Sequence, residues 1–131
     1  MVVTPLYAGL LTLLYLVLIF QVIRFRRQGI SLGDGGDPNM LRVIRGHANF
    51  AEHIPLALLL MLVMELGKFS IYLLHALGIA LIVSRVLHAY ALSFTQKFRF
   101  GRVWGAGITI AVLAVEAVSC IYYWLKVQLI W

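Results

Sequence analysis

Four long apolar stretches, separated by short polar connectors, constrain the fold of this chain more than any other feature of its sequence. A helix needs roughly 20 apolar residues to cross the hydrocarbon core of a bilayer. The 131 residues are 63% hydrophobic, and a soluble domain of this size has too little interior to bury that much apolar surface. We therefore expect an all-α integral membrane protein, a four-helix transmembrane bundle that forms a single domain over residues 1–131. The expected spans cover residues 3–27, 40–66, 71–95 and 103–124.

Basic residues gather at one end of this expected bundle. The connectors 28–39 and 96–102 and the adjoining helix ends hold eight Lys or Arg side chains, against two, Lys68 and Lys126, on the opposite side. The positive-inside rule then places both connectors in the cytosol and both termini outside. The basic residues behind the net charge of +6 cluster at helix ends. This distribution indicates membrane topology and anion binding, and no nucleic-acid partner is expected.

A polar stripe interrupts the second expected span. Arg45, Asn49 and Glu52 stand at i, i+4 and i+7, so their side chains point from one face of a helix. The apolar part that follows, residues 54–64, covers only about 17 Å at 1.5 Å per residue. The polar half must therefore enter the membrane or reach its boundary. A charged side chain costs roughly 2.5–3.5 kcal/mol at the bilayer centre. Such a stripe indicates a place where partners, water or a ligand meet the helix.

The third expected span has the opposite polarity, because Ser84, Arg85 and His88 lie in its second half. A tight turn at residues 67–70 predicts that spans two and three are antiparallel neighbours, which puts both polar halves at one membrane level. Two structural interpretations follow. Arg85 could neutralise Glu52, and Glu116 could pair with His75 in the other half of the bundle.

The side chains expected at this level suit a small zwitterionic ligand. Arginine forks match carboxylates or phosphates, and Glu52 suits an ammonium group. Glutathione fits this combination, and an aminophospholipid head group fits almost as well. The histidines show no spacing that resembles a metal site. The segment 33–36 lacks the Gly-Lys-Ser/Thr ending of a phosphate-binding loop and is interpreted as a connector.

The polar stripe resembles the second-helix signature of the MAPEG family, the membrane-associated proteins in eicosanoid and glutathione metabolism. That signature is present in full as Arg45, Asn49, Glu52 and Pro55. Two shorter segments support the resemblance: residues 21–27 look like the leukotriene synthase branch, and residues 84–88 look like the Gly-Arg-Val-Ala-His of the prostaglandin E synthase branch. The likeness covers essentially the whole chain, and its overall character is similar to small bacterial members.

The resemblance implies a homotrimer in a bacterial inner membrane, with glutathione bound as co-substrate between subunits near the cytosolic surface. It implies a detoxifying transferase or peroxidase that activates the glutathione thiolate for attack on lipophilic electrophiles or lipid hydroperoxides. An arginine after the third span would stabilise the thiolate, and by spacing it is Arg99 or Arg102. The residues implied to bind glutathione are Arg26, Arg45, Asn49, Glu52, His53, Arg85 and His88.

Two positions depart from the eicosanoid branches. Leu92 stands where those branches have a functional tyrosine, and Ala48 replaces an arginine of the prostaglandin branch. These differences argue against a dedicated eicosanoid enzyme. Two other functions stay open: a non-catalytic membrane protein that binds glutathione or an anionic lipid, and a small transporter subunit that uses Glu52 and Arg85 as a charge relay.

Overall fold

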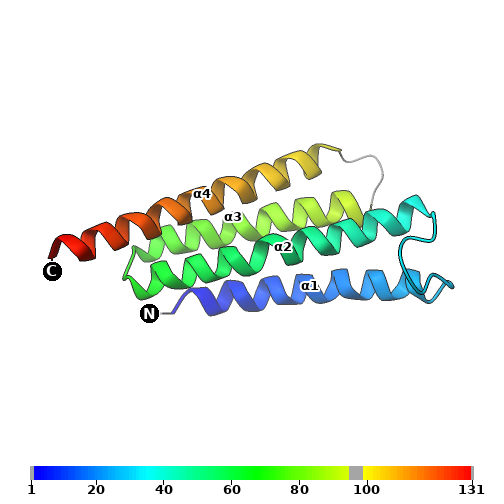
Figure 1. Ribbon diagram of the computed structural model, residues 1–131, viewed down its shortest axis with the longest axis horizontal. Helices are drawn as coiled ribbons and strands as arrows, with labels where there is room; N and C mark the ends of the chain where they lie inside the picture. Colours follow the sequence, from blue (N-terminus) through cyan, green and yellow to red (C-terminus); the bar gives the residue numbers. More distant parts are fainter. Residues whose placement is uncertain (1, 95–98, 131) are drawn as a thin grey trace.

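The computed structural model describes residues 2–94 and 99–130, which form four long helices lying side by side (Figure 1). The elements are α1 at Thr4–Arg26, α2 at Pro38–Leu66, α3 at Ile71–Ala89, a π-helical segment η1 at Tyr90–Phe94, and α4 at Arg99–Ile130. All four α-helices are long and apolar enough to cross a membrane, and the described residues contain no strand. The predicted all-helical fold with four helices of spanning length is therefore confirmed.

The fourth helix is longer than the sequence predicts. It begins at Arg99 rather than at residue 103 and ends at Ile130 rather than at residue 124. Its ends carry Arg102 and Lys126, whose long side chains can keep a charged head in the interface while the helix continues past the apolar core. The predicted end of the third span at residue 95, and residues 96–98 of the predicted cytosolic connector, lie outside the described residues.

The N-terminus of α1 is held by a carboxylate from α2. The backbone amides of Val3 and Thr4 donate to Glu65, and the Thr4 nitrogen lies 2.8 Å from its Oε2 atom. These amides have no partner within their own helix, and a negative charge is favourable at a helix N-terminus. Glu65 therefore fastens the start of α1 to the end of α2.

The connector between α1 and α2 ends in a helix cap. Gly33, Gly35 and Gly36 all adopt positive φ, the conformation that glycine reaches without a steric penalty. The Asp37 side chain then accepts a hydrogen bond of 2.9 Å from the amide of Asn39. This is the usual bond of an N-cap residue, and it starts α2 two turns before the polar stripe.

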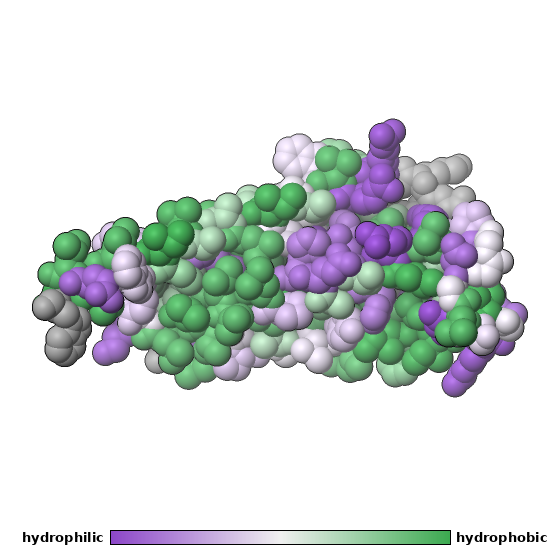
Figure 2. Space-filling view, viewed as in Figure 1, coloured by the Kyte–Doolittle hydropathy of each residue, from purple (hydrophilic) through white to green (hydrophobic). Residues whose placement is uncertain are grey.

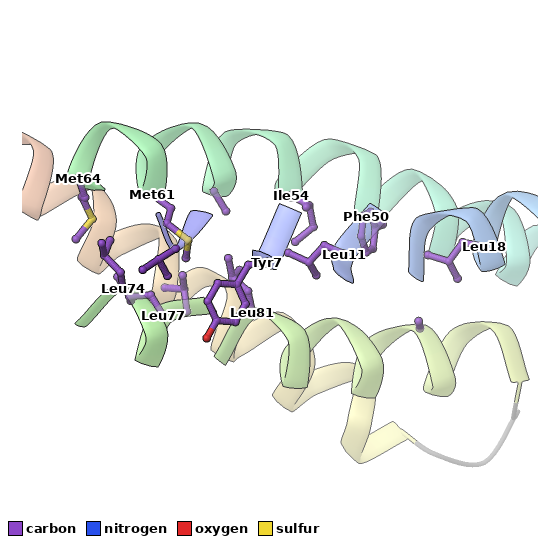
Figure 3. Packing of buried hydrophobic residues seen from close by; sticks show 14 residues of the cluster. Tyr7, Leu11, Leu18, Phe50, Ile54, Met61, Met64, Leu74, Leu77 and Leu81 are labelled. Atoms are coloured by element: carbon purple, nitrogen blue, oxygen red, sulfur yellow. The ribbon is translucent and has the colours of Figure 1, made fainter. Parts of the chain in front are cut away.

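An apolar core runs along the centre of the bundle (Figure 3). Its largest members are Tyr7, Leu11 and Leu18 from α1, Phe50, Ile54, Met61 and Met64 from α2, and Leu74, Leu77 and Leu81 from α3. The outer surface is apolar as well. In α1 and in α4, only 17% of the most hydrophobic 18-residue stretch is buried within the chain, so most of its apolar side chains face outward. Lipid or another copy of the chain must cover these outward faces.

The predicted pairing of His75 with Glu116 is wrong. The hydroxyl of Tyr7 on α1 lies 2.8 Å from Nδ1 of His75 and donates to the His75 carbonyl at 3.2 Å. Glu116 is fully buried on α4, and neither of its carboxyl oxygens has a hydrogen-bond partner in the described part of the chain. The imidazole thus uses a partner on α1, which the sequence could not place beside it.

Helix α4 approaches α3 closely along a stripe of small residues. Gly101, Gly105 and Thr109 follow one another at a spacing of four and are all buried. A Cβ atom at Gly105 would lie only 2.6 Å from the Ser84 carbonyl oxygen and 2.8 Å from the Cβ atom of His88. Small residues at this spacing let membrane helices pack backbone to backbone. The distance between α3 and α4 therefore depends on the absence of a side chain at position 105.

We expect Gly105→Ala to destabilise the protein by roughly 1–3 kcal/mol, the usual cost of overpacking a tight contact. The matched control is Gly107→Ala on the same helix, where a Cβ atom would meet nothing within 4 Å. Thermal unfolding in detergent should show a lower midpoint for the first variant and an equal or higher midpoint for the second. Equal midpoints for both variants would contradict the close approach.

Candidate functional site

The polar parts of α2, α3 and α4 meet at the side chain of Arg85, which is only 1% exposed. One terminal nitrogen donates to Oδ1 of Asn49 on α2 at 2.7 Å. The other donates to the Thr109 hydroxyl at 2.6 Å and to the Gly105 carbonyl at 3.2 Å, both on α4. The bond between Asn49 and Arg85 confirms that the polar halves of the second and third helices lie at one level.

The interpretation that Arg85 neutralises Glu52 is wrong. The hydrogen-bond partners of Arg85 are an amide, a hydroxyl and a carbonyl, and no carboxylate of the described residues lies within ion-pair distance. Glu52 is exposed on the surface of α2, about one turn beyond Asn49, while polar atoms of α4 surround the guanidinium. The proposed charge relay between these two residues therefore lacks its direct contact. A buried cation without a counter-ion favours an anion nearby.

A cleft of about 510 Å³ opens beside this network, between α2, α3 and α4. Its lining consists of Leu41, Arg42, Arg45, Asn49, His88, Leu92, Arg102, Val103 and Ala106. Three of these described lining residues are arginines and none is acidic. Figure 2 shows hydrophobic residues over much of the molecule and hydrophilic ones gathered from the centre of the visible face toward the end where α4 begins.

The charges around this arginine-lined cleft favour anions strongly. At an effective dielectric constant of ~20, an anion about 4 Å from one guanidinium gains roughly 4 kcal/mol, against about 1 kcal/mol in bulk water. Asn49 also lines the cleft, and because its Oδ1 atom accepts from Arg85, its Nδ2 group is the part of the amide that can donate to a ligand. The geometry suits a ligand with more than one anionic group.

The predicted site residues fall into two groups. Arg45, Asn49, His88 and Arg102 line the cleft, and Arg85 lies directly behind Asn49. His53 donates from Nδ1 to the Asn49 carbonyl at 2.7 Å.

The second group, Arg26, Glu52 and Arg99, is absent from the cleft lining as described. The guanidinium of Arg26 instead lies 3.2–3.4 Å from three carbonyl oxygens of the connector, those of Ile30, Ser31 and Gly33. The assignment of both groups to glutathione stays a prediction.

Three residues of this region were not predicted from the sequence. Arg42 lines the cleft and donates to the Ala91 carbonyl of η1 at 3.0 Å, while Gly105 and Thr109 hold Arg85. Arg42 precedes Arg45 by three residues, so its position on the same helix face could have been inferred. The spacing of four between Gly105 and Thr109 was the available signal on α4.

Four helices of membrane-spanning length, with a cationic cleft between three of them, define an integral membrane protein of a recognisable kind. The chain belongs to the MAPEG family, whose family model matches residues 4–122, so the resemblance inferred from the polar stripe is confirmed. Inner membrane protein YecN of Escherichia coli K12 is 35% identical over 122 residues, which cover 92% of this chain and 92% of YecN. YecN of Escherichia coli O6:H1 matches to the same extent. No solved structure matches the chain.

We expect Thr109→Val to lower the free energy of unfolding by about 1–3 kcal/mol, because it leaves a buried guanidinium with one acceptor fewer. The control is Thr12→Val on α1, where the exposed hydroxyl only bonds the Ala8 carbonyl of its own helix. Denaturation of both variants in the same detergent should separate them. A Thr109→Val protein as stable as the control would show that Arg85 does not depend on this hydroxyl.

Proposed function

We propose that this protein is a glutathione-dependent transferase or peroxidase of the bacterial inner membrane. In this proposal the arginine-lined cleft binds glutathione and stabilises its thiolate, which attacks lipophilic electrophiles or lipid hydroperoxides arriving from the lipid. In a conjugation, the sulfur forms a bond to an electrophilic carbon and the leaving group departs with the electron pair. Membership of the MAPEG family supports the class of reaction, and the name of the relative YecN supports the membrane.

The single observation that carries the proposal is the cluster of Arg42, Arg45 and Arg102 in a cleft whose described lining has no acid. Glutathione has two carboxylates, one ammonium group and one thiol. Arg42 and Arg45 lie one turn apart on α2 and both line the cleft, while Arg42 also donates to the Ala91 carbonyl. An arginine fork binds a carboxylate through a pair of hydrogen bonds. Glu52 continues the same face and offers a partner for the ammonium group.

Arg102 is the proposed thiolate-stabilising residue. It lines the cleft from the first turns of α4, opposite the arginines of α2, whereas Arg99 is exposed and does not line it. A free thiol with a pKa near 8.5 is only a few per cent ionised at neutral pH, and a fixed cation beside it lowers that pKa. The two roles thus divide between helices, with α2 binding the peptide and α4 activating its sulfur.

The proposed assembly is a homotrimer. Glu52 stands at the midpoint of α2, fourteen residues from each end, and its side chain is exposed. Left in hydrocarbon, such a charge costs about 2.5–3.5 kcal/mol, so a neighbouring subunit that covers this face and completes the open cleft removes a large penalty. Cross-linking in native membranes that stops at dimers would contradict the trimer.

One observation favours a second candidate, a non-catalytic protein that binds glutathione or an anionic lipid. Leu92 lines the cleft at the position where the eicosanoid branches have a functional tyrosine. A leucine there offers no hydroxyl to a reacting sulfur or oxygen. Turnover of chlorodinitrobenzene with glutathione distinguishes the two candidates, because the second predicts bound glutathione and no conjugate.

We expect Arg45→Ala to raise the dissociation constant of glutathione ten- to a hundredfold, about 1.4–2.8 kcal/mol, because a carboxylate loses its paired donors. Calorimetric titration of the purified protein in detergent measures this change. Arg24→Ala is the control, since it removes an exposed charge near the end of α1 that is not part of the cleft. Equal losses of affinity in both variants would indicate a general charge effect rather than a site.

We expect Arg102→Leu to keep most of the glutathione affinity and to abolish the thiolate absorbance at about 240 nm. The physical reason is that the carboxylate contacts on α2 remain while the cation proposed to lie beside the sulfur is lost. Arg99→Leu is the paired control and should retain the absorbance. Retention of the signal in the Arg102→Leu protein, with its loss in the Arg99→Leu protein, would reverse the assignment.

A further inference from the structure

The turn between α2 and α3 and the C-terminal part of α4 lie at the end of the bundle opposite the start of α4 (Figure 1). A second cleft lies between this turn and the last turns of α4. It measures about 320 Å³. The lining consists of Gly67, Lys68, Phe69, Tyr122, Tyr123, Lys126, Val127 and Ile130. These described residues include two lysines and two tyrosines and no acid.

We propose that this lysine cleft binds the head group of an acidic phospholipid, in the leaflet opposite the arginine-lined cleft. Lys68 and Lys126 come from different elements but line one hollow, so a single phosphate can meet both ammonium groups. Tyrosine hydroxyls donate hydrogen bonds at the membrane interface while their rings stay in the apolar layer. The apolar Val127 and Ile130 complete the lining on α4.

The backbone at Lys68 gives an independent reason to look for a role of this side chain. The amides of Lys68 and Phe69 donate to the Glu65 and Met64 carbonyls at 3.0 and 3.1 Å, which ends α2 in a Schellman motif. Lys68 occupies the left-handed position of that motif, with φ of 56°, where glycine is the favoured residue. It is the one non-glycine residue with positive φ in the described part of the chain. A strained residue kept at such a turn points to a use for its side chain.

The floor of the lysine cleft is built by aromatic packing rather than by mobile side chains. The rings of Phe69 and Tyr123 meet edge to face with centroids 6.2 Å apart. Tyr123 also covers Gly67, where an added Cβ atom would lie 3.1 Å from the ring. The turn and α4 are therefore fixed relative to each other before any lipid arrives.

A simpler role for Lys68 is a favourable charge at the C-terminus of α2. The two explanations differ in what removal of the charge does to the protein without lipid. Loss of a helix-end charge lowers stability in every condition. Loss of a lipid ligand removes only the stabilisation that lipid provides, and Lys68→Gly in addition gives the turn the residue that its backbone favours.

The experiment measures the unfolding midpoint of purified protein in mild detergent with phosphatidylglycerol, with phosphatidylcholine or with inorganic phosphate. For the unmodified chain we expect phosphatidylglycerol to raise the midpoint, and we expect the other two additives to leave it unchanged. Without lipid, the unfolding midpoint of Lys68→Gly should match or exceed that of the unmodified chain. With phosphatidylglycerol, Lys68→Gly should show no rise in midpoint, and Lys126→Gln should lose most of the rise. Arg24→Gln is the matched control, because it removes one exposed charge at the other end of the bundle and should keep the full shift.

Four outcomes would overturn the proposal. A full shift in the Lys68→Gly, Lys126→Gln double variant would place lipid binding elsewhere. Equal shifts with phosphatidylcholine would indicate apolar contact without charge selection, and equal shifts with inorganic phosphate would indicate a free anion. A lower lipid-free midpoint for Lys68→Gly would assign Lys68 to the helix end.

Discussion

The rest of this structure depends on the hydrogen bonds that the Arg85 guanidinium makes to two neighbouring helices. This guanidinium is almost fully buried, and it is the point where α2, α3 and α4 are joined by hydrogen bonds to Asn49, Gly105 and Thr109. Apart from the bonds of Glu65 to the start of α1 and of Tyr7 to His75, the helices meet mainly through apolar side chains. In a membrane such apolar contacts do little to fix rotation or depth, since lipid tails are equally apolar. Directional bonds to one buried cation supply the register that apolar packing does not. The close approach of α4 at Gly105 is part of the same arrangement, because it brings the carbonyl within reach.

The same residue prepares the arginine-lined cleft for a ligand. Its charge is solvated by neutral oxygens and is not cancelled by a carboxylate of the described residues, so it adds to the field of Arg42, Arg45 and Arg102. It also fixes the orientation of the Asn49 amide. A site arranged in this way before binding loses little free energy to reorganisation when an anion enters. Its open side, next to exposed Glu52, is where a neighbouring subunit in the proposed trimer would complete it.

The two ends of the molecule differ in chemistry as well as in charge. One end presents three arginines in a cleft, with forks suited to carboxylates, and the other presents two lysines and two tyrosines around a fixed turn. Arginine is weakly hydrated and binds planar anions in pairs of hydrogen bonds, whereas lysine acts as a hydrated point charge. This difference separates the proposed binding of a small peptide at one membrane surface from the proposed binding of a lipid head group at the other.

Much of the fold could be predicted from the sequence, because the length of an apolar stretch and the spacing of its polar residues act locally. These local features determined the four helices, the shared face of Arg45, Asn49 and Glu52, and the common level of the second and third polar halves. What they did not determine is which partner each polar side chain finds. Arg85 could have met Glu52 but bonds to α4 instead, His75 bonds Tyr7 rather than Glu116, and Arg102 rather than Arg99 faces the cleft. Only the tertiary structure decided these contacts, because they depend on how the helices are rotated about their axes, and that rotation is set by small residues such as Gly105 that lie far away in the chain.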